Sequence, residues 1–253
     1  MRIGLIGAGN MARAIVRGWG EPVLCCDAGS GRARELAAEL GGEALAGPAQ
    51  VAAAAEALLL AHKPAGLQQV AEQVDAAGKP VLSVLGGVTL AQLEAAYPGS
   101  PVVCLMPNTP VEVRLGITCV VFGATVDQAL RTEVTTRFSR LGTVVELPES
   151  QMNAASAVMG VGPAYEALLA EAQADAAVRH GLPPALAGQL VAETKAGTAA
   201  LLAARRYDTL IVRRDVTSPG GSTARGLAAL ERGGVRAAFS AAMDAVLGGE
   251  SGR

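Results

Sequence analysis

The chain has 253 residues, of which 51% are hydrophobic and 17% charged, and its formal net charge is −2. This length suits one large domain or two smaller ones, and so small a charge gives no electrostatic reason to expect nucleic acid or an anionic membrane as a partner. Because no apolar stretch reaches the roughly 20 residues that a membrane-spanning helix needs, and the start shows no basic leader, we predict a cytoplasmic protein that binds neither.

Short apolar runs alternate with helical stretches through the first part of the chain. Strands are predicted at residues 2–6, 23–26, 57–61, 80–84, 102–106, 117–122 and 143–147. Helices are predicted at residues 10–19, 30–40, 66–76 and 126–141, the second with Ser30 as its N-cap. Continuous apolar strands that alternate with helices are typical of a parallel sheet covered on both faces.

After Pro148 the strand-like runs become scarce and helical patterning rich in Ala and Leu takes over. Helices are predicted at residues 151–158, 163–180, 184–204 and 221–232, with one more near the C-terminus. The fold class is therefore α/β, with an N-terminal Rossmann-type doubly wound sheet at residues 1–148 and an all-α domain at residues 149–253.

The cysteines are Cys25, Cys26, Cys104 and Cys119. No two of them form a Cys-x-x-Cys pair, and adjacent residues on a strand point to opposite faces. We therefore predict buried free thiols and no metal site.

A glycine-rich loop follows the first predicted strand and begins the first predicted helix. Its residues are Gly7, Ala8, Gly9, Asn10 and Met11, with Ala12 as the third small position. In this setting the first glycine allows the tight turn, and the second lets the backbone approach a pyrophosphate. The helix N-terminus supplies free N–H groups to the phosphates, so the loop predicts a dinucleotide site.

Asp27 lies about twenty residues after the first glycine, at the end of the second predicted strand. An acidic residue at that point can accept a hydrogen bond from the ribose 2′-hydroxyl, which favours NADH. Ser30, Arg32 and Arg34 follow closely and could instead meet the 2′-phosphate of NADPH. Both cofactors stay open, as does a purely structural turn at Asp27.

Five further segments carry a resemblance to a known family. They are Ala-His-Lys-Pro at 61–64, Ser-Val-Leu-Gly-Gly-Val-Thr at 83–89, Met-Pro-Asn-Thr-Pro at 106–110, Gly-Pro-Ala-Tyr at 162–165 and Thr-Ser-Pro-Gly-Gly-Ser-Thr at 217–223. In this order the chain resembles the pyrroline-5-carboxylate reductases over about residues 1–246. The resemblance implies reduction of 1-pyrroline-5-carboxylate, a cyclic imino acid, to L-proline with NADPH or NADH.

The resemblance also implies an assembly. The helical domain would interlock with that of a second copy, the active site would form at this dimer interface, and the family includes rings of dimers. The predicted helices of this domain are rich in Ala and Leu, which fits a buried interface better than a free surface.

Loops at the predicted strand ends should line one crevice beside the glycine loop, because ligands of open α/β sheets bind outside the carboxyl ends of strands. By resemblance, His62, Lys63, Pro64 and Asn108 border the cofactor. The prolines could equally serve to end strands and begin helices.

A second glycine-bearing loop precedes the predicted helix at 221–232. Its residues are Ser218, Pro219, Gly220, Gly221, Ser222 and Thr223. Unpaired N–H groups before a helix bind anions, and by resemblance this loop holds the substrate carboxylate while Thr223, the one residue assigned a catalytic role, contacts the ring nitrogen. The alternative is that Ser218 and Thr223 cap the helix.

The sequence offers no obvious general acid to protonate a substrate, and this favours an imine substrate. Only His62 and His180 are histidines, whereas reducing a ketone needs a positioned proton donor. A protonated imine already carries its proton, so positioning can suffice. The chain departs from the family pattern at Val161, where a serine is usual, and at Asp27-Ala28, where Asn-Arg is common.

Two other interpretations compete with this one. A β-hydroxyacid dehydrogenase would need a lysine on a helix of the second domain, for which Lys195 is the sole candidate. A non-catalytic cofactor-binding protein on the same fold is the other, since a fold alone does not decide function.

Overall fold

The computed structural model describes residues 1–248, which form parts of two compact units, Met1–Pro163 and Ala164–Arg253. The predicted domain boundary after residue 148 lies fifteen residues before this division, and residues 249–253 of the predicted second domain lie outside the described residues.

The first unit is built on an eight-stranded sheet with the order β3-β2-β1-β4-β5-β6-β7-β8. The strands are β1 (Ile3–Ile6), β2 (Leu24–Cys26), β3 (Glu43–Ala44), β4 (Ala57–Leu60), β5 (Val81–Ser83), β6 (Val102–Pro107), β7 (Gly116–Phe122) and β8 (Gly142–Glu146). The first six are parallel, which confirms that part of the prediction, while β7 runs antiparallel to β6. The connection at residues 108–115 is shorter than the dozen or so residues that a parallel crossover needs.

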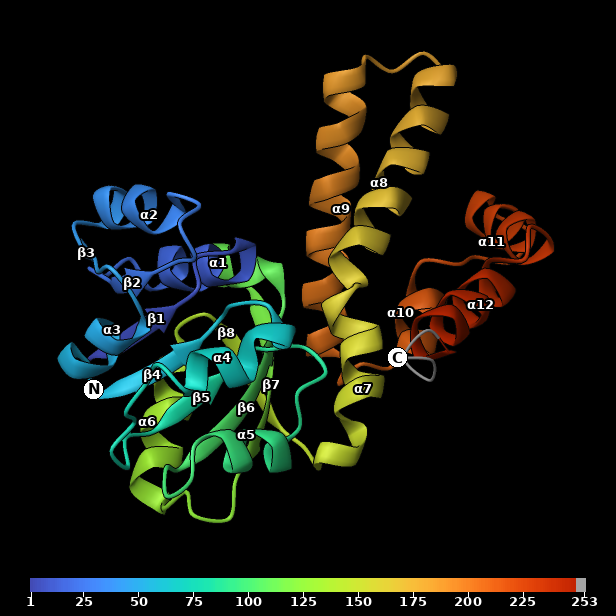
Figure 1. Ribbon diagram of the computed structural model, residues 1–253. Helices are drawn as coiled ribbons and strands as arrows, with labels where there is room; N and C mark the ends of the chain where they lie inside the picture. The colour runs from blue at the N-terminus through green and yellow to red at the C-terminus, as the bar shows by residue number, and fades with distance from the viewer. Residues whose placement is uncertain (249–253) are drawn as a thin grey trace. The chain divides into compact units, whose positions relative to one another are not determined.

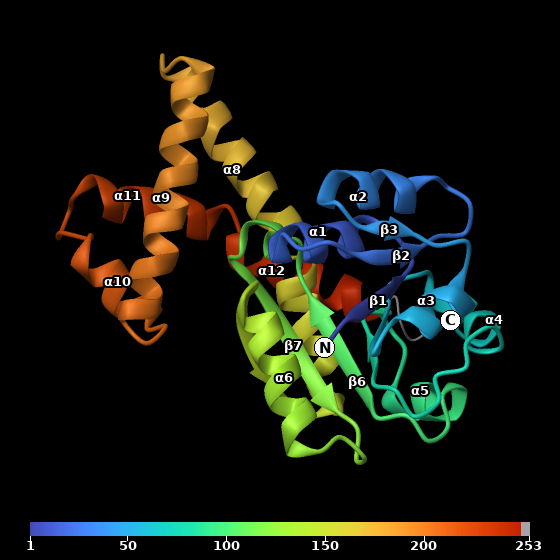
Figure 2. The same cartoon turned by 90° about the vertical axis from the view of Figure 1, so that its left-hand side faces the viewer.

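Helices cover both faces of this sheet (Figure 1 and Figure 2). One core packs α1 (Asn10–Trp19), α2 (Arg32–Leu40) and α6 (Gln128–Ser139) against the sheet. The other core contains side chains of α3 (Pro48–Ala54), α4 (Leu67–Ala71) and α5 (Leu90–Ala96). Leu5 enters the first core and its neighbour Ile6 the second, because successive strand residues point to opposite faces. A strand buried on both sides must be apolar throughout, as predicted.

Several local predictions were wrong. Helix α2 begins at Arg32 with Gly31 as its N-cap and no side-chain capping bond, so Ser30 is not the cap. The helix predicted at 66–76 is instead a 3₁₀ turn, η1 (Pro64–Gly66), followed by a helix that ends at Ala71. Helix α5 was missed although Thr89 and Gln92 form a capping box in front of it, which is a recognisable sequence signal.

Short helical turns connect the end of the sheet to the long helices. These are η3 (Glu149–Gln151), α7 (Met152–Ala155) and the π-helical turn η4 (Ser156–Gly160), whereas a further 3₁₀ turn, η2 (Thr109–Val113), lies between β6 and β7. The sequence pattern predicted one regular helix at 151–158 where three of these follow one another. Helix α8 (Gly162–Arg179) then begins at the edge of the first unit and continues into the second.

The second unit is helical, as predicted. Helices α8 and α9 (Pro184–Ala204) form an antiparallel pair (Figure 1), and α10 (Thr209–Asp215), α11 (Ser222–Arg232) and α12 (Val235–Gly248) follow. Helix α10 was missed, although Asp208 caps it by accepting hydrogen bonds from the N–H groups of Leu210 and Ile211 at 2.9 and 3.1 Å.

This unit buries little of its own apolar surface. Helices α8, α11 and α12 contain no buried residue, and α9 and α10 contribute only Ala187 and Val212. Within residues 1–248, no helix combines the length and the hydropathy that crossing a membrane requires.

Candidate active site

A cavity of about 520 Å³ opens where the strand order reverses, between β1 and β4. This is the position at which open α/β sheets bind ligands. Nine of the ten predicted cofactor residues line it: Gly7, Ala8, Gly9, Asn10, Met11, Asp27, His62, Lys63 and Pro64. They follow the carboxyl ends of β1, β2 and β4, so the parallel sheet brings together segments that are far apart in the sequence.

The two glycines of the first loop have different roles. Gly7 has φ +104°, and a Cβ there would lie 2.5 Å from the backbone nitrogen of His62. The close approach of the chain after β1 to the chain after β4 therefore requires glycine. Gly9 has φ −73°, and a Cβ there would meet nothing nearer than the Ala61 oxygen at 4.0 Å. Gly9 therefore borders open space, which is room for a pyrophosphate.

The N-terminus of α1 is built to receive an anion. Gly9 is its N-cap and makes no side-chain capping bond, so the N–H groups of the first turn are not covered by a side chain. They carry the positive end of the helix dipole to the cavity. The open space beside Gly9 and these donors together fit the diphosphate of a nicotinamide dinucleotide.

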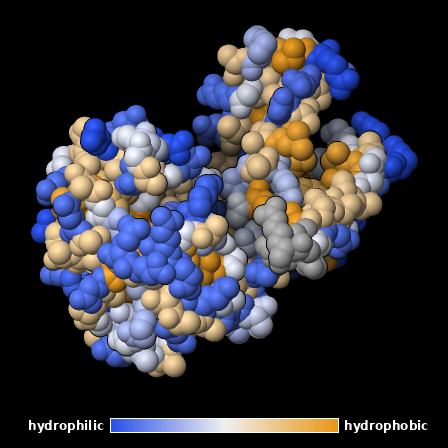
Figure 3. Space-filling model, viewed as in Figure 1, coloured by the Kyte–Doolittle hydropathy of each residue, from blue (hydrophilic) through white to orange (hydrophobic). Residues whose placement is uncertain are grey.

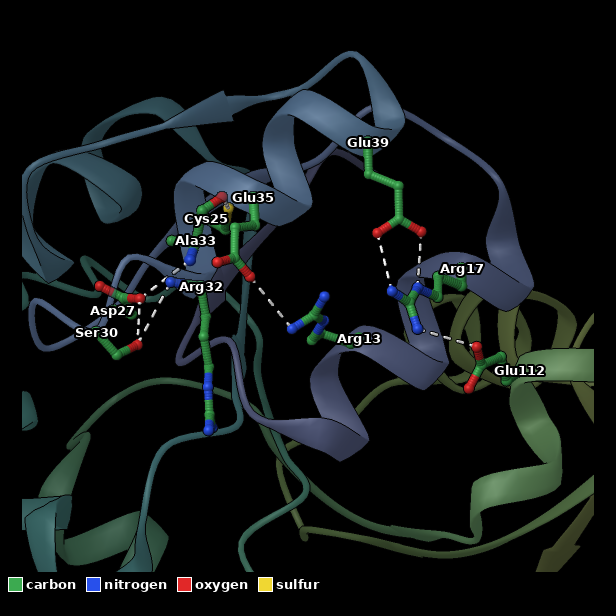
Figure 4. Close-up of polar contacts among 10 residues, drawn as sticks. All are labelled: Arg13, Arg17, Cys25, Asp27, Ser30, Arg32, Ala33, Glu35, Glu39 and Glu112. Atoms are coloured by element: carbon green, nitrogen blue, oxygen red, sulfur yellow. Dashed lines mark hydrogen bonds and ion pairs between the residues drawn. The ribbon is translucent and has the colours of Figure 1, made fainter.

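Asp27 follows β2 and is tied into the first turn of α2 (Figure 4). Its Oδ1 accepts from the Gly29 N–H at 2.9 Å, and its Oδ2 accepts from the Ser30 hydroxyl at 2.6 Å and from the Ala33 N–H at 3.0 Å. Burial acts to raise the pKa of this carboxyl, but the hydrogen bonds outweigh it and the pKa is lowered. Asp27 is therefore a fixed anion at neutral pH.

His62 follows β4 with its ring half-buried. Its Nδ1 lies 2.8 Å from the Lys63 carbonyl oxygen, which requires the hydrogen on Nδ1. Burial lowers the pKa of this imidazole, against a smaller opposing contribution from the same backbone contact. The neutral ring then presents an unprotonated Nε2, which is a poor source of a proton.

Further residues line the cavity that were not assigned to cofactor binding, although the sequence named Ser30 and Arg32 as possible phosphate contacts and placed the loop after the fourth predicted strand in the crevice. The further lining residues are Ala28, Ser30, Arg32, Ala61, Val84, Leu85 and Gly86. The last three follow β5, and their position directly after a buried parallel strand was the signal that placed their segment in the crevice.

Asn108 is the predicted cofactor residue that does not line this cavity. It is buried, its Nδ2 donates to the Met159 carbonyl at 3.1 Å, and its Oδ1 accepts from the Ile117 N–H at 2.9 Å. These bonds join the start of η2 to β7 and to the π-helical turn η4. The contacts give Asn108 a structural role in the first unit.

We expect Asn108→Ala to lower the free energy of unfolding by about 1–3 kcal/mol, because it leaves a buried carbonyl at Met159 and a half-buried N–H at Ile117 without their side-chain partner. Denaturant unfolding measures this. Asn153→Ala, an exposed change on α7, is the control and should fall within about 0.5 kcal/mol of the native chain. Unchanged stability of Asn108→Ala combined with lost dinucleotide binding would contradict the structural role.

The second predicted loop precedes α11. Gly220 has φ +68°, the Gly221 N–H donates to the Ser218 carbonyl at 3.1 Å, and Arg225 Nη1 donates to the Gly220 carbonyl at 2.7 Å. Gly221 is the N-cap of α11, and no side chain caps the helix. Neither Ser218 nor Thr223 therefore serves as the cap, and the first-turn N–H groups remain as donors beside a half-buried Thr223.

Comparison with known proteins connects these features to one family. The model for pyrroline-5-carboxylate reductase dimerisation matches residues 149–250, and that for coenzyme F420-dependent NADP oxidoreductases matches residues 2–87. The pyrroline-5-carboxylate reductase of Synechocystis is 40% identical over 198 residues, covering 78% of this chain and 74% of that protein. The chain belongs to the pyrroline-5-carboxylate reductase family.

Solved structures of the family share the fold along nearly the whole chain. The reductase of Streptococcus pyogenes superposes with a TM-score of 0.88 at 28% identity, covering 96% of this chain and 95% of that one. The Plasmodium falciparum pyrroline carboxylate reductase, crystallised with NADP bound, gives 0.86 at 25% identity and covers 97% and 95%. The Rossmann unit and the helical dimerisation domain are thus those of pyrroline-5-carboxylate reductases.

Lys195, which a dehydrogenase mechanism would require, is engaged elsewhere. On α9 its Nζ lies 2.6 Å from Glu166 Oε2 on α8, and both residues belong to the second unit. An exposed ion pair between neighbouring helices explains this lysine.

The cysteines of this family member are buried and free. Desolvation raises the pKa of Cys25 and of Cys26 to about 11, so neither is a thiolate at neutral pH. Among residues 1–248 no group of His, Cys, Asp or Glu side chains is arranged to hold a metal ion.

Proposed function

We propose that this chain reduces 1-pyrroline-5-carboxylate to L-proline with NADPH or NADH. The observation that carries the proposal is the cavity beside Gly9, lined by nine residues expected to bind the cofactor, in a chain 40% identical to a protein named for this activity. Loop 218–223 supplies a second set of backbone donors, which suits a carboxylate substrate.

The first unit would hold the cofactor. The N-terminus of α1 binds the diphosphate through its free N–H groups, and His62, Lys63 and Pro64 border the ribose and nicotinamide. The bound cofactor supplies a hydride to the imine carbon. Asn108 has no assigned contact with the cofactor, because its side chain is bonded to Met159 and Ile117.

The second loop would hold the substrate. The N–H groups at Ser222 and Thr223 bind its carboxylate, and the glycines at 220 and 221 let that group come close to the backbone. The Thr223 hydroxyl contacts the ring nitrogen and fixes the direction from which the hydride arrives. Residues from a second copy complete this site at the dimer interface.

No protein acid is needed for this chemistry. The imine reacts in its protonated form, so the hydride neutralises a positive charge and the nitrogen keeps the proton it already carries. His62 suits such a site, because a neutral ring with an unprotonated Nε2 adds no charge beside the iminium.

The helical domain, assigned to residues 149–253, would interlock with its counterpart in a homodimer, and dimers would assemble into rings. Large apolar side chains that stay exposed on α8, on α9 and in the connection between them support this: Leu168, Val178, Leu182, Leu186, Leu190 and Leu201. Figure 3 shows apolar residues at the surface of these helices. Helices without a buried face of their own need a partner to cover it.

We assign the protein to the cytoplasm. Four buried cysteines without a disulfide suit a reducing compartment. The substrate and the nicotinamide cofactors are also small and water-soluble, so nothing in the proposed reaction calls for a membrane.

The direct test is oxidation of NADH and of NADPH, followed at 340 nm on addition of 1-pyrroline-5-carboxylate, with L-proline identified as the product. We expect turnover that depends on both substrates. Tight dinucleotide binding with no turnover by either cofactor would instead favour a non-catalytic cofactor-binding protein.

A further inference from the structure

The end of β2 lies where a Rossmann fold reads the adenosine ribose. In this chain the loop 28–31 and the first turn of α2 are next to that point, and their donors would suit the 2′-phosphate that distinguishes NADPH from NADH. The structure shows a protein carboxylate already bound to those donors (Figure 4).

Asp27 uses the polar groups that a 2′-phosphate would need. The N–H groups of Gly29 and Ala33 both donate to its carboxylate, and the Ser30 hydroxyl gives its hydrogen to the same group. A phosphate placed here would have to displace the carboxylate or lie against it. Both outcomes are unfavourable, because the carboxylate is held by three bonds and carries a like charge.

The same carboxylate keeps room for a ribose hydroxyl. An ionised carboxylate has about four acceptor positions, and Asp27 fills one on Oδ1 and two on Oδ2. The position that remains on Oδ1 can accept a hydrogen bond from a 2′-hydroxyl, which NADH has and NADPH lacks.

The neighbouring arginines do not offset the effect of Asp27 on the 2′-phosphate. Arg34 is absent from the cavity lining, and Arg13 is paired with Glu35 at 3.5 Å. Arg32 lines the cavity, but its side chain is exposed and no bond among the described residues holds it. An exposed cation is screened by salt, whereas the Asp27 anion is held by three hydrogen bonds.

We infer that Asp27 makes this chain bind NADH in preference to NADPH, by occupying the anion position at α2 and accepting from the ribose 2′-hydroxyl. This rests on the dinucleotide site of the proposed function. It adds a specificity that family membership does not decide, since a relative binds NADP.

The deciding measurement is the dissociation constant of each reduced cofactor for the purified native protein, by isothermal titration calorimetry without substrate. We expect NADH to bind at least about tenfold more tightly than NADPH. Equal affinities, or tighter binding of NADPH, would overturn the inference without any variant being made.

Two variants then assign the preference to Asp27. Asp27→Asn removes the charge and keeps an acceptor for the Gly29 N–H, and Asp27→Ser also frees space. Both should shift the ratio of the two constants toward NADPH by at least about tenfold. Glu43→Gln is the control, because it removes an exposed acidic charge from β3, the strand beside β2, outside the cavity lining, and should leave the ratio unchanged.

A third variant, Arg32→Ala, tests whether Arg32 instead of Asp27 sets the cofactor preference. If Arg32→Ala changes the ratio while both Asp27 variants leave it unchanged, Arg32 reads the ribose and the inference is wrong. Thermal unfolding of each variant shows whether loss of the bonds to α2 has altered the fold, and the native ratio stands independently of that result.

Failure here and failure of the proposed function give different results. A chain that converts pyrroline-5-carboxylate to proline but prefers NADPH refutes the role of Asp27 alone. A chain that prefers NADH in binding and turns over no imine refutes the function and leaves the role of Asp27 standing.

Discussion

Gly9→Val is expected to raise the dissociation constant for either reduced cofactor at least about a hundredfold while the protein stays folded. The backbone at Gly9 has φ −73°, which any residue can adopt, and a Cβ there meets no protein atom closer than 4.0 Å. A valine side chain would therefore extend into the cavity and occupy the space assigned to the pyrophosphate. Calorimetric titration with NADH and NADPH measures the loss.

Gly47→Val is the matched control. Gly47 is also the N-cap of a helix, α3, with extended backbone and open space around it, and it is not part of the cavity wall. Both variants carry the same cost of a β-branched residue at an N-cap, so only a difference in cofactor affinity reports on the cavity. Unchanged affinity in Gly9→Val would remove the pyrophosphate from the place we assign to it.

Gly7→Ala, unlike Gly9→Val, should destabilise the protein. With φ +104° and a Cβ that would lie 2.6 Å from Ala61 backbone atoms, glycine is a requirement of the fold itself. Its loss of binding would come with loss of stability. The pair of variants thus separates a glycine that the chain needs from one that the ligand needs.

Thr223→Ala should lower kcat by roughly ten- to a thousandfold, the range for losing one positioned hydrogen bond to the reacting group. Thr223 is the second residue of α11 and does not cap it, so removal of its hydroxyl breaks no capping bond. Steady-state rates with pyrroline-5-carboxylate at saturating cofactor measure the effect, and a thermal melt should be close to that of the native protein.

Two further variants show whether the lower kcat of Thr223→Ala comes from loss of its hydroxyl. Thr223→Ser keeps the hydroxyl and should recover most of the rate, whereas Lys195→Ala removes an exposed ion pair with Glu166 and should change turnover little. A full rate in Thr223→Ala with an inactive Lys195→Ala would transfer the chemistry to the lysine and support the dehydrogenase alternative.

Local features of the sequence predicted most of the first unit. Strands β1 and β4 are buried on both faces, so each is an unbroken apolar run that can be recognised without knowing its neighbours. The glycine loop is equally local, because the tight turn and the helix that follows lie within a few residues. The long helices α8 and α9 were predicted close to their bounds, since Ala and Leu patterning persists over many turns.

Short elements and polar contacts were harder to predict from the sequence. Helix α4 stops at Ala71, although its sequence could continue, because Val74 and Ala76 are buried in the second core outside the helix. The reversal of β7 depends on the length of one connection. The bonds of Asn108 join residues nine and fifty-one positions away, and no local pattern reports such partners.

By itself the sequence determined the order of the long strands and helices, the glycine loop and the motifs of the family, because these depend on neighbours along the chain. The sequence also predicted that loops at the strand ends line one crevice, and the cavity wall contains residues after β1, β2, β4 and β5. Only the tertiary structure decided that Asn108 lies outside this wall, bonded to Met159 and Ile117, and that the Asp27 carboxylate is held by α2. These depend on where packing places distant backbone donors, and periodicity carries no information about that.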